Sequence, residues 1–352
     1  MKTVSYDTVF LFENISLNLY EKVYKLKKGG NMNENMIEIV KKIKKDYGEE
    51  SIMLLGDEEN KQIETISSGS YLLDEAIGIG GYPYGRIIEI YGPESSGKTT
   101  LALHAIAEIQ KKGGVAAYID AENALDLKYA ENIGVNLNQM ILSQPDSGEQ
   151  ALEITNKLIQ TNLVNIIIVD SVAALVPEVE LEGEMTDQTI GAQARLMSKG
   201  LRKMTKLINQ NNVIVIFINQ LREKVGVIYG SPEVTSGGRA LKFYSTIRID
   251  IRKFDFIKKE SEIIGIKSKV KIVKNKVSPP FKVVNLDIIY GQGISKIGEL
   301  VDICVEKDII KKSGTWYYYN DEKLGQGREK VISYLKENDL ILQEIEEKIK
   351  NQ

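Results

Sequence analysis

The segment GPESSGKT at positions 92–99 constrains the fold of this chain more than any other stretch. It fits the pattern G-x-x-x-x-G-K-[ST], with a strand-like apolar run, 86–91, before it and a helical run from Thr100 after it. In such a P-loop the backbone N–H groups turn toward a phosphate, and the helix N-terminus adds positive potential. A Gly/Ser turn that matches by chance is the alternative, and the two flanking elements argue against it. The residues expected to cradle a nucleotide are Gly92, Pro93, Glu94, Ser95, Ser96, Gly97, Lys98, Thr99 and Thr100.

Two side chains of this loop carry the expected chemistry. The Lys98 ammonium would reach the β- and γ-phosphates of a bound nucleotide. The Thr99 hydroxyl would ligate Mg²⁺. The loop therefore predicts a nucleotide-binding protein, with Lys98 in the reacting part of the site.

Composition excludes several other classes of protein. The single cysteine, Cys304, rules out a disulfide framework and a cysteine-based zinc site. No stretch approaches 18 uninterrupted apolar residues, so no membrane span is expected. The VFLF run at 9–12 is too short for a signal peptide. A cytoplasmic location follows as the expectation. The formal net charge of −3 neither suggests nor excludes a nucleic-acid partner, because a local basic track would be enough.

The N-terminal segment 1–31 shows no clean hydrophobic period and ends just before Met32. Two interpretations stay open, an untranslated leader read as protein or a flexible extension. From Met36 the apolar positions fall at spacings of four, three and four residues, which draws one stripe along a helix. The segment 32–59 has little core of its own. Its stripe is expected to pack on the main domain or on a neighbouring subunit.

Strands then alternate with helices, which predicts βαβ units and a mostly parallel sheet with helices on both faces. The stretch 240–292 changes character to short strands and turns, which indicates an antiparallel extension of that sheet. We expect an α/β core over 60–295 and a small C-terminal α/β domain over 296–352. The expected core strands are Val115–Ile119, Asn165–Val169, Val213–Ile218, Thr246–Ile251, Lys269–Lys274 and Phe281–Ile289, and the expected core helices are 149–160 and 190–210.

Polar side chains follow three of the core strands. Asp170 closes NIIIVD, where a P-loop protein places its second Mg²⁺-associated carboxylate, and Ser171 could join the same metal shell. Glu122 lies two residues beyond Asp120, the end of an earlier strand, and could polarise the attacking water, although a helix-start glutamate is an equal alternative. Gln220 ends VIVIFINQ and could report the γ-phosphate to the glycine-rich, cationic segment after it. These strand ends meet at one edge of a parallel sheet.

Six long motifs identify a family. GPESSGKTT, YIDAENALD, VDSVAALVP, FINQLREKVGV, SGGRALKFY and KNKVSPPF stand in this order and together closely resemble the bacterial RecA recombinases. The resemblance runs from about Asn35 to the C-terminus. It implies a RecA-type P-loop NTPase core, a DNA-dependent ATPase that uses ATP and Mg²⁺, and a helical filament on single-stranded DNA. It also implies pairing with double-stranded DNA, strand exchange, DNA repair and self-cleavage of the SOS repressor.

The resemblance also assigns roles to single residues. Glu122 would be the catalytic base, Gln220 the γ-phosphate sensor, and Thr99 and Asp170 the metal-shell residues. Residues 182–190 and 221–235 would be two DNA-binding loops, and the helix from Asn35 would dock on a neighbour. Further implied positions are Asp126 and Tyr129 at the adenine, Lys274 and Lys276 at the ATP of the adjacent subunit, and Arg195, Arg202, Arg222, Lys224, Gly237 and Gly238 at DNA.

Three other functions share parts of this pattern. A small-molecule kinase shares the P-loop, but it predicts a lid with arginines and a defined acceptor pocket. An ATP-gated scaffold without turnover is disfavoured by Glu122. A hexameric helicase shares the core, but the DNA-loop motifs and the C-terminal domain favour a filament.

Overall fold

A computed structural model describes residues 32–52, 63–184, 191–223 and 233–350. The chain divides into two compact units, Met1–Gln62 and Ile63–Gln352. In the first unit, helix α2 (Met32–Tyr47) is followed by a short 3₁₀ turn, η1 (Glu49–Ser51). The stripe predicted on this helix is exposed at both ends within its own unit, with Met36 47% and Tyr47 76% accessible. The segment 1–31, for which two interpretations stay open, lies outside the described residues.

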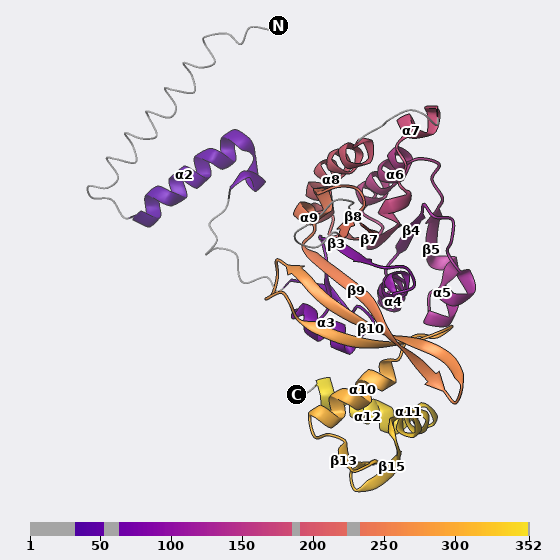
Figure 1. Cartoon of the computed structure of the whole chain (residues 1–352). Helices are drawn as coiled ribbons and strands as arrows, with labels where there is room; N and C mark the ends of the chain where they lie inside the picture. The colour runs from indigo at the N-terminus through magenta and orange to yellow at the C-terminus, as the bar shows by residue number, and fades with distance from the viewer. Residues whose placement is uncertain (1–31, 53–62, 185–190, 224–232, 351–352) are drawn as a thin grey trace, which may run out of the picture. The chain divides into compact units, whose positions relative to one another are not determined.

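The second unit is built on one large sheet (Figure 1). The order of its strands is β12-β11-β10-β9-β3-β7-β6-β4-β5, and β8 pairs with β7. All pairs from β9 to β5 are parallel, whereas β9 to β12 pair antiparallel. The strands are β3 (Ile87–Gly92), β4 (Ala116–Asp120), β5 (Met140–Ser143), β6 (Ile166–Asp170), β7 (Ile214–Glu223), β8 (Glu233–Thr235), β9 (Ile247–Lys259), β10 (Glu262–Asn275), β11 (Val283–Ile289) and β12 (Gly293–Ile294).

Helices and short elements complete this unit. Strands β1 (Thr65–Ile66) and β2 (Tyr82–Pro83) form a separate pair, and a three-stranded antiparallel sheet lies near the C-terminus. The core helices are α3 (Tyr71–Ile77), α4 (Lys98–Lys111), α5 (Leu127–Ile133), α6 (Gly148–Gln160), α7 (Glu178–Glu182), α8 (Ala192–Gln210) and α9 (Ala240–Tyr244), with the short 3₁₀ turns η2 (Leu137–Gln139) and η3 (Val172–Ala174). The C-terminal elements are α10 (Lys296–Glu306), β13 (Lys311–Ser313), β14 (Trp316–Tyr319), β15 (Glu322–Gln326), α11 (Arg328–Glu337) and α12 (Asp339–Lys350).

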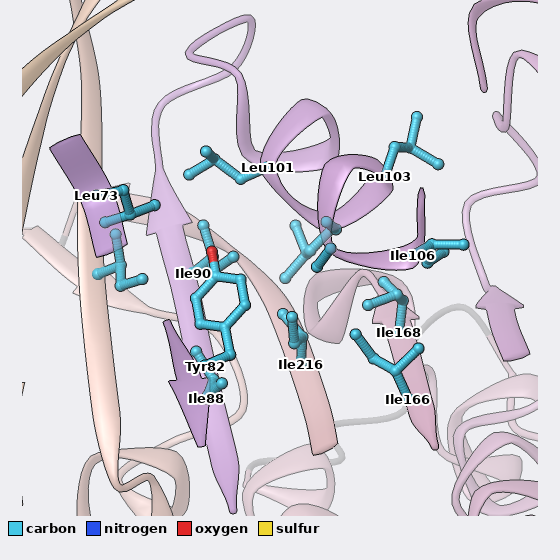
Figure 2. Close-up of a cluster of buried hydrophobic side chains, with 14 of the residues drawn as sticks. Leu73, Tyr82, Ile88, Ile90, Leu101, Leu103, Ile106, Ile166, Ile168 and Ile216 are labelled. Carbon is cyan, nitrogen blue, oxygen red and sulfur yellow. The ribbon is translucent and has the colours of Figure 1, made fainter. Parts of the chain in front are cut away.

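The central strands are buried on both faces, and neighbouring residues of one strand belong to two different cores. On one face Ile166 and Ile168 pack with the α4 residues Leu101 and Ile106 (Figure 2). On the other face Ile167 and Val169 pack with side chains of α6 and α8. Strands that are apolar along their whole length are stable where helices cover both faces of a parallel sheet, as they do here. The predicted fold class is confirmed.

Several strands differ in length from their predicted ranges. β7 continues past Ile218 to Glu223, where its last residues pair with β8 instead of with the central sheet. β9 and β10 continue past their predicted ends as a long hairpin whose outer residues are exposed. Strand β5 was not predicted at all. β5 lies at the edge of the sheet and is only partly buried, so its run of apolar residues is short.

A buried carboxyl joins the C-terminal elements to helix α3. Glu299 on α10 is 2% exposed and accepts hydrogen bonds from Ser70 Oγ at 2.8 Å and from Tyr71 N at 2.9 Å. These donors lie at the N-terminus of α3, where a carboxylate also meets the positive end of the helix dipole. Burial nevertheless raises the pKa of Glu299 to about 7. Nearby, Tyr71 OH donates to Glu346 on α12 at 3.0 Å.

The raised pKa of Glu299 predicts a pH-dependent free energy of unfolding. An acid with a folded pKa near 7 instead of 4.5 stabilises the fold fully below pH 4.5, and this stabilisation is lost as the pH rises through 7. The loss amounts to about 3 kcal/mol at most. Glu299→Gln should therefore lose less stability between pH 5.5 and 8 than the unsubstituted chain. Denaturant midpoints at both pH values measure this difference.

The matched control for this prediction is Glu306→Gln, at an exposed position of the same helix. It should keep the pH dependence of the unsubstituted chain. If Glu299→Gln and Glu306→Gln lose the same stability over this pH range, Glu299 is not the titrating group.

Candidate functional site

The P-loop joins β3 to α4, and close packing explains its glycines. A Cβ atom at Gly92 would lie 2.0 Å from the backbone oxygen of Ile251 on β9. Gly97 has φ +102°, and a Cβ there would lie 2.3 Å from Ile288 Cδ1 on β11. Inside the loop, Ser96 Oγ donates to the carbonyl of Pro93 at 2.8 Å. The antiparallel extension of the sheet therefore packs against the loop and restricts its conformation.

Lys98 folds back onto the loop from which it projects. Its ammonium donates to the carbonyl oxygens of Gly92 at 3.1 Å and Pro93 at 2.6 Å. Burial lowers the pKa of Lys98, while the carboxylates of Asp170 and Glu122 oppose this shift. The ammonium thus has backbone partners that a bound phosphate, being fully charged, can replace.

Three side chains meet at the carboxyl end of β6. Asp170 Oδ2 accepts hydrogen bonds from Thr99 Oγ1 at 3.0 Å and from Tyr118 OH at 2.6 Å. Burial raises the pKa of Asp170, and these two donors work against that rise. A hydroxyl beside a carboxylate offers the hard oxygen donors that Mg²⁺ prefers, usually together with substrate phosphates. The residues present therefore fit Mg²⁺.

Sequence reasoning missed Tyr118. Its position in the middle of the buried strand β4 resembles an ordinary core aromatic. The sequence alone held no signal for its role, which depends on the register between two strands: Tyr118 lies two residues before Asp120, and Asp120 pairs with Asp170. Alternate residues of a strand share a face, so the ring of Tyr118 points to the same side as Asp170.

The predicted base and the predicted sensor lie in contact. Gln220 Nε2 donates to Glu122 Oε1 at 2.8 Å, and Ser171 Oγ donates to the same oxygen. Gln220 is the last residue of β7 that pairs with β3, and Glu122 and Ser171 lie just beyond β4 and β6, which are consecutive with β7 in the sheet. Ser171 was expected in the metal shell, and its hydroxyl bonds to Glu122 instead. This places an exposed carboxylate beside an amide at the edge of the P-loop.

A cavity of 530 Å³ opens beside the P-loop. Asp126 caps helix α5 by accepting a hydrogen bond from Tyr129 N at 2.9 Å. Tyr129 OH lies 2.9 Å from Thr100 Oγ1, which ties α5 to the start of α4. The cavity is lined by Ser95, Gly97, Thr100, Asp126, Lys128, Tyr129, Asn132, Ile266, Ile288, Tyr290 and Gly291. Its apolar walls and its position next to the loop suit a planar base.

A cationic surface runs along α8. Arg195 and Arg202, both exposed, line a hollow of 660 Å³ together with Lys199 and Lys203. The two lysines were not predicted. Lys199 lies four residues after Arg195 and three before Arg202, and Lys203 lies four after Lys199, so all four cations share one helix face. Four cations on one face attract a phosphate backbone.

The base of the second expected DNA loop is held by the same region. Gly237 N donates to Gln193 Oε1 on α8 at 3.1 Å, and Gly238 follows it with φ +76°. Arg222 on β7 pairs with Val234 on β8. Strand β8 is anchored by Arg252, whose guanidinium forms two hydrogen bonds with Glu233, at 3.0 and 2.7 Å. Lys224 and most of the two expected DNA loops lie outside the described residues.

Lys274 and Lys276 occupy a different place from the P-loop lysine. Lys274 Nζ donates to the carbonyls of Lys242 at 2.6 Å and Phe243 at 3.1 Å, near the end of α9. Lys276 Nζ donates to Phe243 O at 3.4 Å. Burial, and then the charge of Lys276, lowers the pKa of Lys274 to about 8. Neither lysine forms a hydrogen bond with the P-loop of its own chain.

Glu122→Gln tests the role of the exposed carboxylate. The amide keeps the size of the side chain but cannot accept a proton from water. We expect nucleotide affinity to stay within about twofold and hydrolysis to slow by about 100-fold or more, the range for loss of a general base. Glu131→Gln, an exposed change on α5, is the control. Loss of affinity with unchanged turnover would contradict the assignment. Equilibrium binding and phosphate release measure the two effects.

Comparisons with known proteins complete the description of the site. The family model "RecA N-terminal domain" matches residues 34–295, and "RecA C-terminal domain" matches 298–352. The chain is 59% identical over 311 residues to Protein RecA of Latilactobacillus sakei, covering 88% of each chain. It is 59% identical over 312 residues to Protein RecA of Lactiplantibacillus plantarum, covering 89% of this chain and 82% of that protein.

A third relative is Protein RecA of Listeria monocytogenes, 57% identical over 313 residues, which cover 89% of this chain and 90% of that protein. No helix in the described part of the chain is long and apolar enough to cross a membrane. The phosphate loop, the carboxylate with its hydroxyl partners, and these matches lead to one conclusion. The chain belongs to the RecA family, DNA-dependent ATPases that use ATP and Mg²⁺, form filaments on DNA and serve recombination, repair and the SOS response.

Proposed function

We propose that this chain hydrolyses ATP at a site in which Glu122 is the base, Lys98 binds the phosphates, and Thr99 with Asp170 holds Mg²⁺. The observation that carries this proposal is the meeting of Glu122, Ser171 and Gln220 beside the hydroxyl and carboxylate of Thr99 and Asp170. When bound, Mg²⁺ supplies charge neutralisation at the phosphates. Lys98 exchanges the Gly92 and Pro93 carbonyls for phosphate oxygens, and Glu122 accepts a proton from the attacking water.

Gln220 connects the state of the nucleotide to DNA binding in this proposal. Its amide now donates to Glu122, and a γ-phosphate oxygen would compete for the same N–H group. The adjacent Asn219 donates to Ser236 O at 3.0 Å, on the far side of the second expected loop. A shift of Gln220 therefore reaches both ends of that loop. The residues assigned to DNA stay as predicted, namely Arg195, Arg202, Arg222, Lys224, Gly237 and Gly238.

Assembly supplies the remaining part of the proposed site. Lys274 and Lys276 act on the ATP of an adjacent subunit, and the Asn35 helix docks on a neighbour, so that ATP lies between protomers. The proposed division is an oligomerisation segment at 32–59, an ATPase core at 60–295 and a C-terminal domain at 296–352. We also place the protein in the cytoplasm. The single cysteine, buried as a free thiol, is consistent with a reducing compartment.

Mixing two inactive variants tests the shared site. Glu122→Gln protein and a Lys274→Ala/Lys276→Ala double variant should each be inactive alone. A head-to-tail interface places the two groups of each site on different chains. Equal mixing then rebuilds a site with probability of one half times one half, which gives roughly a quarter of the turnover of the unsubstituted chain. DNA-stimulated phosphate release is the measurement.

Recovery should require DNA, on which the two variants assemble together. Each variant on its own, assayed with and without DNA, is the control. No recovery, with joint assembly confirmed by a labelled pull-down, would mean that the lysines act within their own subunit or only on the structure of the interface.

Arg195→Ala with Arg202→Ala tests the cationic surface of α8. Each lost phosphate contact should flatten the salt dependence of single-stranded DNA binding by about 0.7 log units. Lys157→Ala, an exposed change on the neighbouring helix α6, should leave the slope unchanged. Fluorescence anisotropy across a salt series gives both slopes. An unchanged slope in the double variant would move the DNA site elsewhere.

A further inference from the structure

Tyr118 on β4 is the first residue of the motif YIDAENALD, and the proposed function gives it no role. It is 1% exposed and lies in the core that packs against α4. Its neighbours in register are Ile168 on β6 and Leu142 on β5. Its hydroxyl is nevertheless 2.6 Å from Asp170 Oδ2. The ring of Tyr118 thus packs in the core, and its hydroxyl contacts a residue of the proposed ATP site.

The two hydrogen bonds at Asp170 share one oxygen. Thr99 Oγ1 and Tyr118 OH both donate to Oδ2, and Oδ1 accepts no hydrogen bond from the described residues. Two donors from different elements, α4 and β4, fix the plane of the carboxylate. A donor–acceptor distance of 2.6 Å is typical of the strong bonds that hydroxyl groups form with charged oxygens. Oδ1 is left available to other ligands.

The Tyr118 bond also adds a restraint on Asp170 that Thr99 cannot supply by itself. If Thr99 ligates Mg²⁺ through an oxygen lone pair, its single hydrogen is still free to donate to Asp170. With this one hydrogen bond alone, the carboxylate of Asp170 could still rotate about its Cβ–Cγ bond. The buried ring of Tyr118 has no such freedom, because core side chains are closely packed. The phenol therefore supplies rigidity that the threonine alone does not.

We propose that Tyr118 is a positioning residue for Mg²⁺–ATP, whose hydroxyl holds Asp170 in the orientation that serves the metal and keeps Oδ1 free. This inference rests on the role of Asp170 in the proposed function. Residues that orient metal-shell groups typically change metal affinity or activity by 10- to 100-fold when they are replaced. Tyr118 bonds to one oxygen that keeps its second donor, so we expect an effect below that range.

The test is Tyr118→Phe, which keeps the ring and removes only the hydroxyl. The half-saturating Mg²⁺ concentration for binding of a fluorescent methylanthraniloyl-ATP should rise roughly three- to tenfold. Binding of the same analogue in EDTA should stay unchanged, because the P-loop is untouched. A purely structural role for Tyr118 would alter both measurements. An unchanged Mg²⁺ requirement would overturn the proposal.

Tyr82→Phe is the matched control. Tyr82 is fully buried in the same core, and its hydroxyl has no hydrogen-bond partner among the described residues. The Tyr82→Phe substitution therefore removes an equally buried phenol oxygen that makes no contact with Asp170. The Mg²⁺ requirement should match that of the unsubstituted chain. If Tyr82→Phe raises it as much as Tyr118→Phe does, loss of a core hydroxyl is the cause and the proposal is wrong.

Asp170→Asn separates this inference from the proposed function. Alone, it should raise the Mg²⁺ requirement, and adding Tyr118→Phe to it should change nothing further, because the phenol acts through the carboxylate. If Asp170→Asn has no effect, the assignment of Asp170 fails. If Asp170→Asn has its effect and Tyr118→Phe has none, only the role of Tyr118 fails. Additive effects of the two changes would also overturn that role.

Discussion

Burial of the parallel strands on both faces is the constraint on which the rest of this molecule depends. Strands such as Ile166–Asp170 have no solvent-facing side, so polar side chains inside them need buried partners and those that meet solvent stand at the strand ends. Parallel pairing brings those ends to one edge of the sheet. Glu122, Asp170 and Gln220 are neighbours for this reason, although about fifty residues of chain separate each from the next. The apolar core thereby determines where the polar chemistry stands.

A second layer of charged groups lies directly behind the site. Glu89 is fully buried on β3 and binds Arg248 on β9 and Asn219 on β7, at 2.5 and 3.0 Å. Breaking such a pair would leave a charge buried without a partner, which costs about 3–5 kcal/mol. Asn219 adjoins Gln220 and also bonds to Ser236 O. The sensor strand and the end of the second loop are therefore held by one buried carboxylate.

The sequence predicted elements with strong local signals and missed those that depend on partners far along the chain. The P-loop, the buried strands and Glu122 could be found because glycine spacing and apolar runs are local properties. The hydroxyl of Tyr118 could not, since its role depends on the register between β4 and β6. Glu299 was missed for a similar reason, because its partners at Ser70 and Tyr71 lie more than 200 residues away. Local patterns do not encode such pairings.

The contacts under the P-loop have a consequence for the way this protein can change in evolution. Gly92 and Gly97 leave no room for a side chain because Ile251 and Ile288, from strands β9 and β11, lie against them. The antiparallel extension therefore enlarges the sheet and also determines the conformation of the nucleotide loop. A lineage that altered the bulk of either isoleucine would have to reshape the loop in the same step. The two segments are about 150 residues or more apart in the chain. Substitutions in one should nevertheless be accompanied by substitutions in the other.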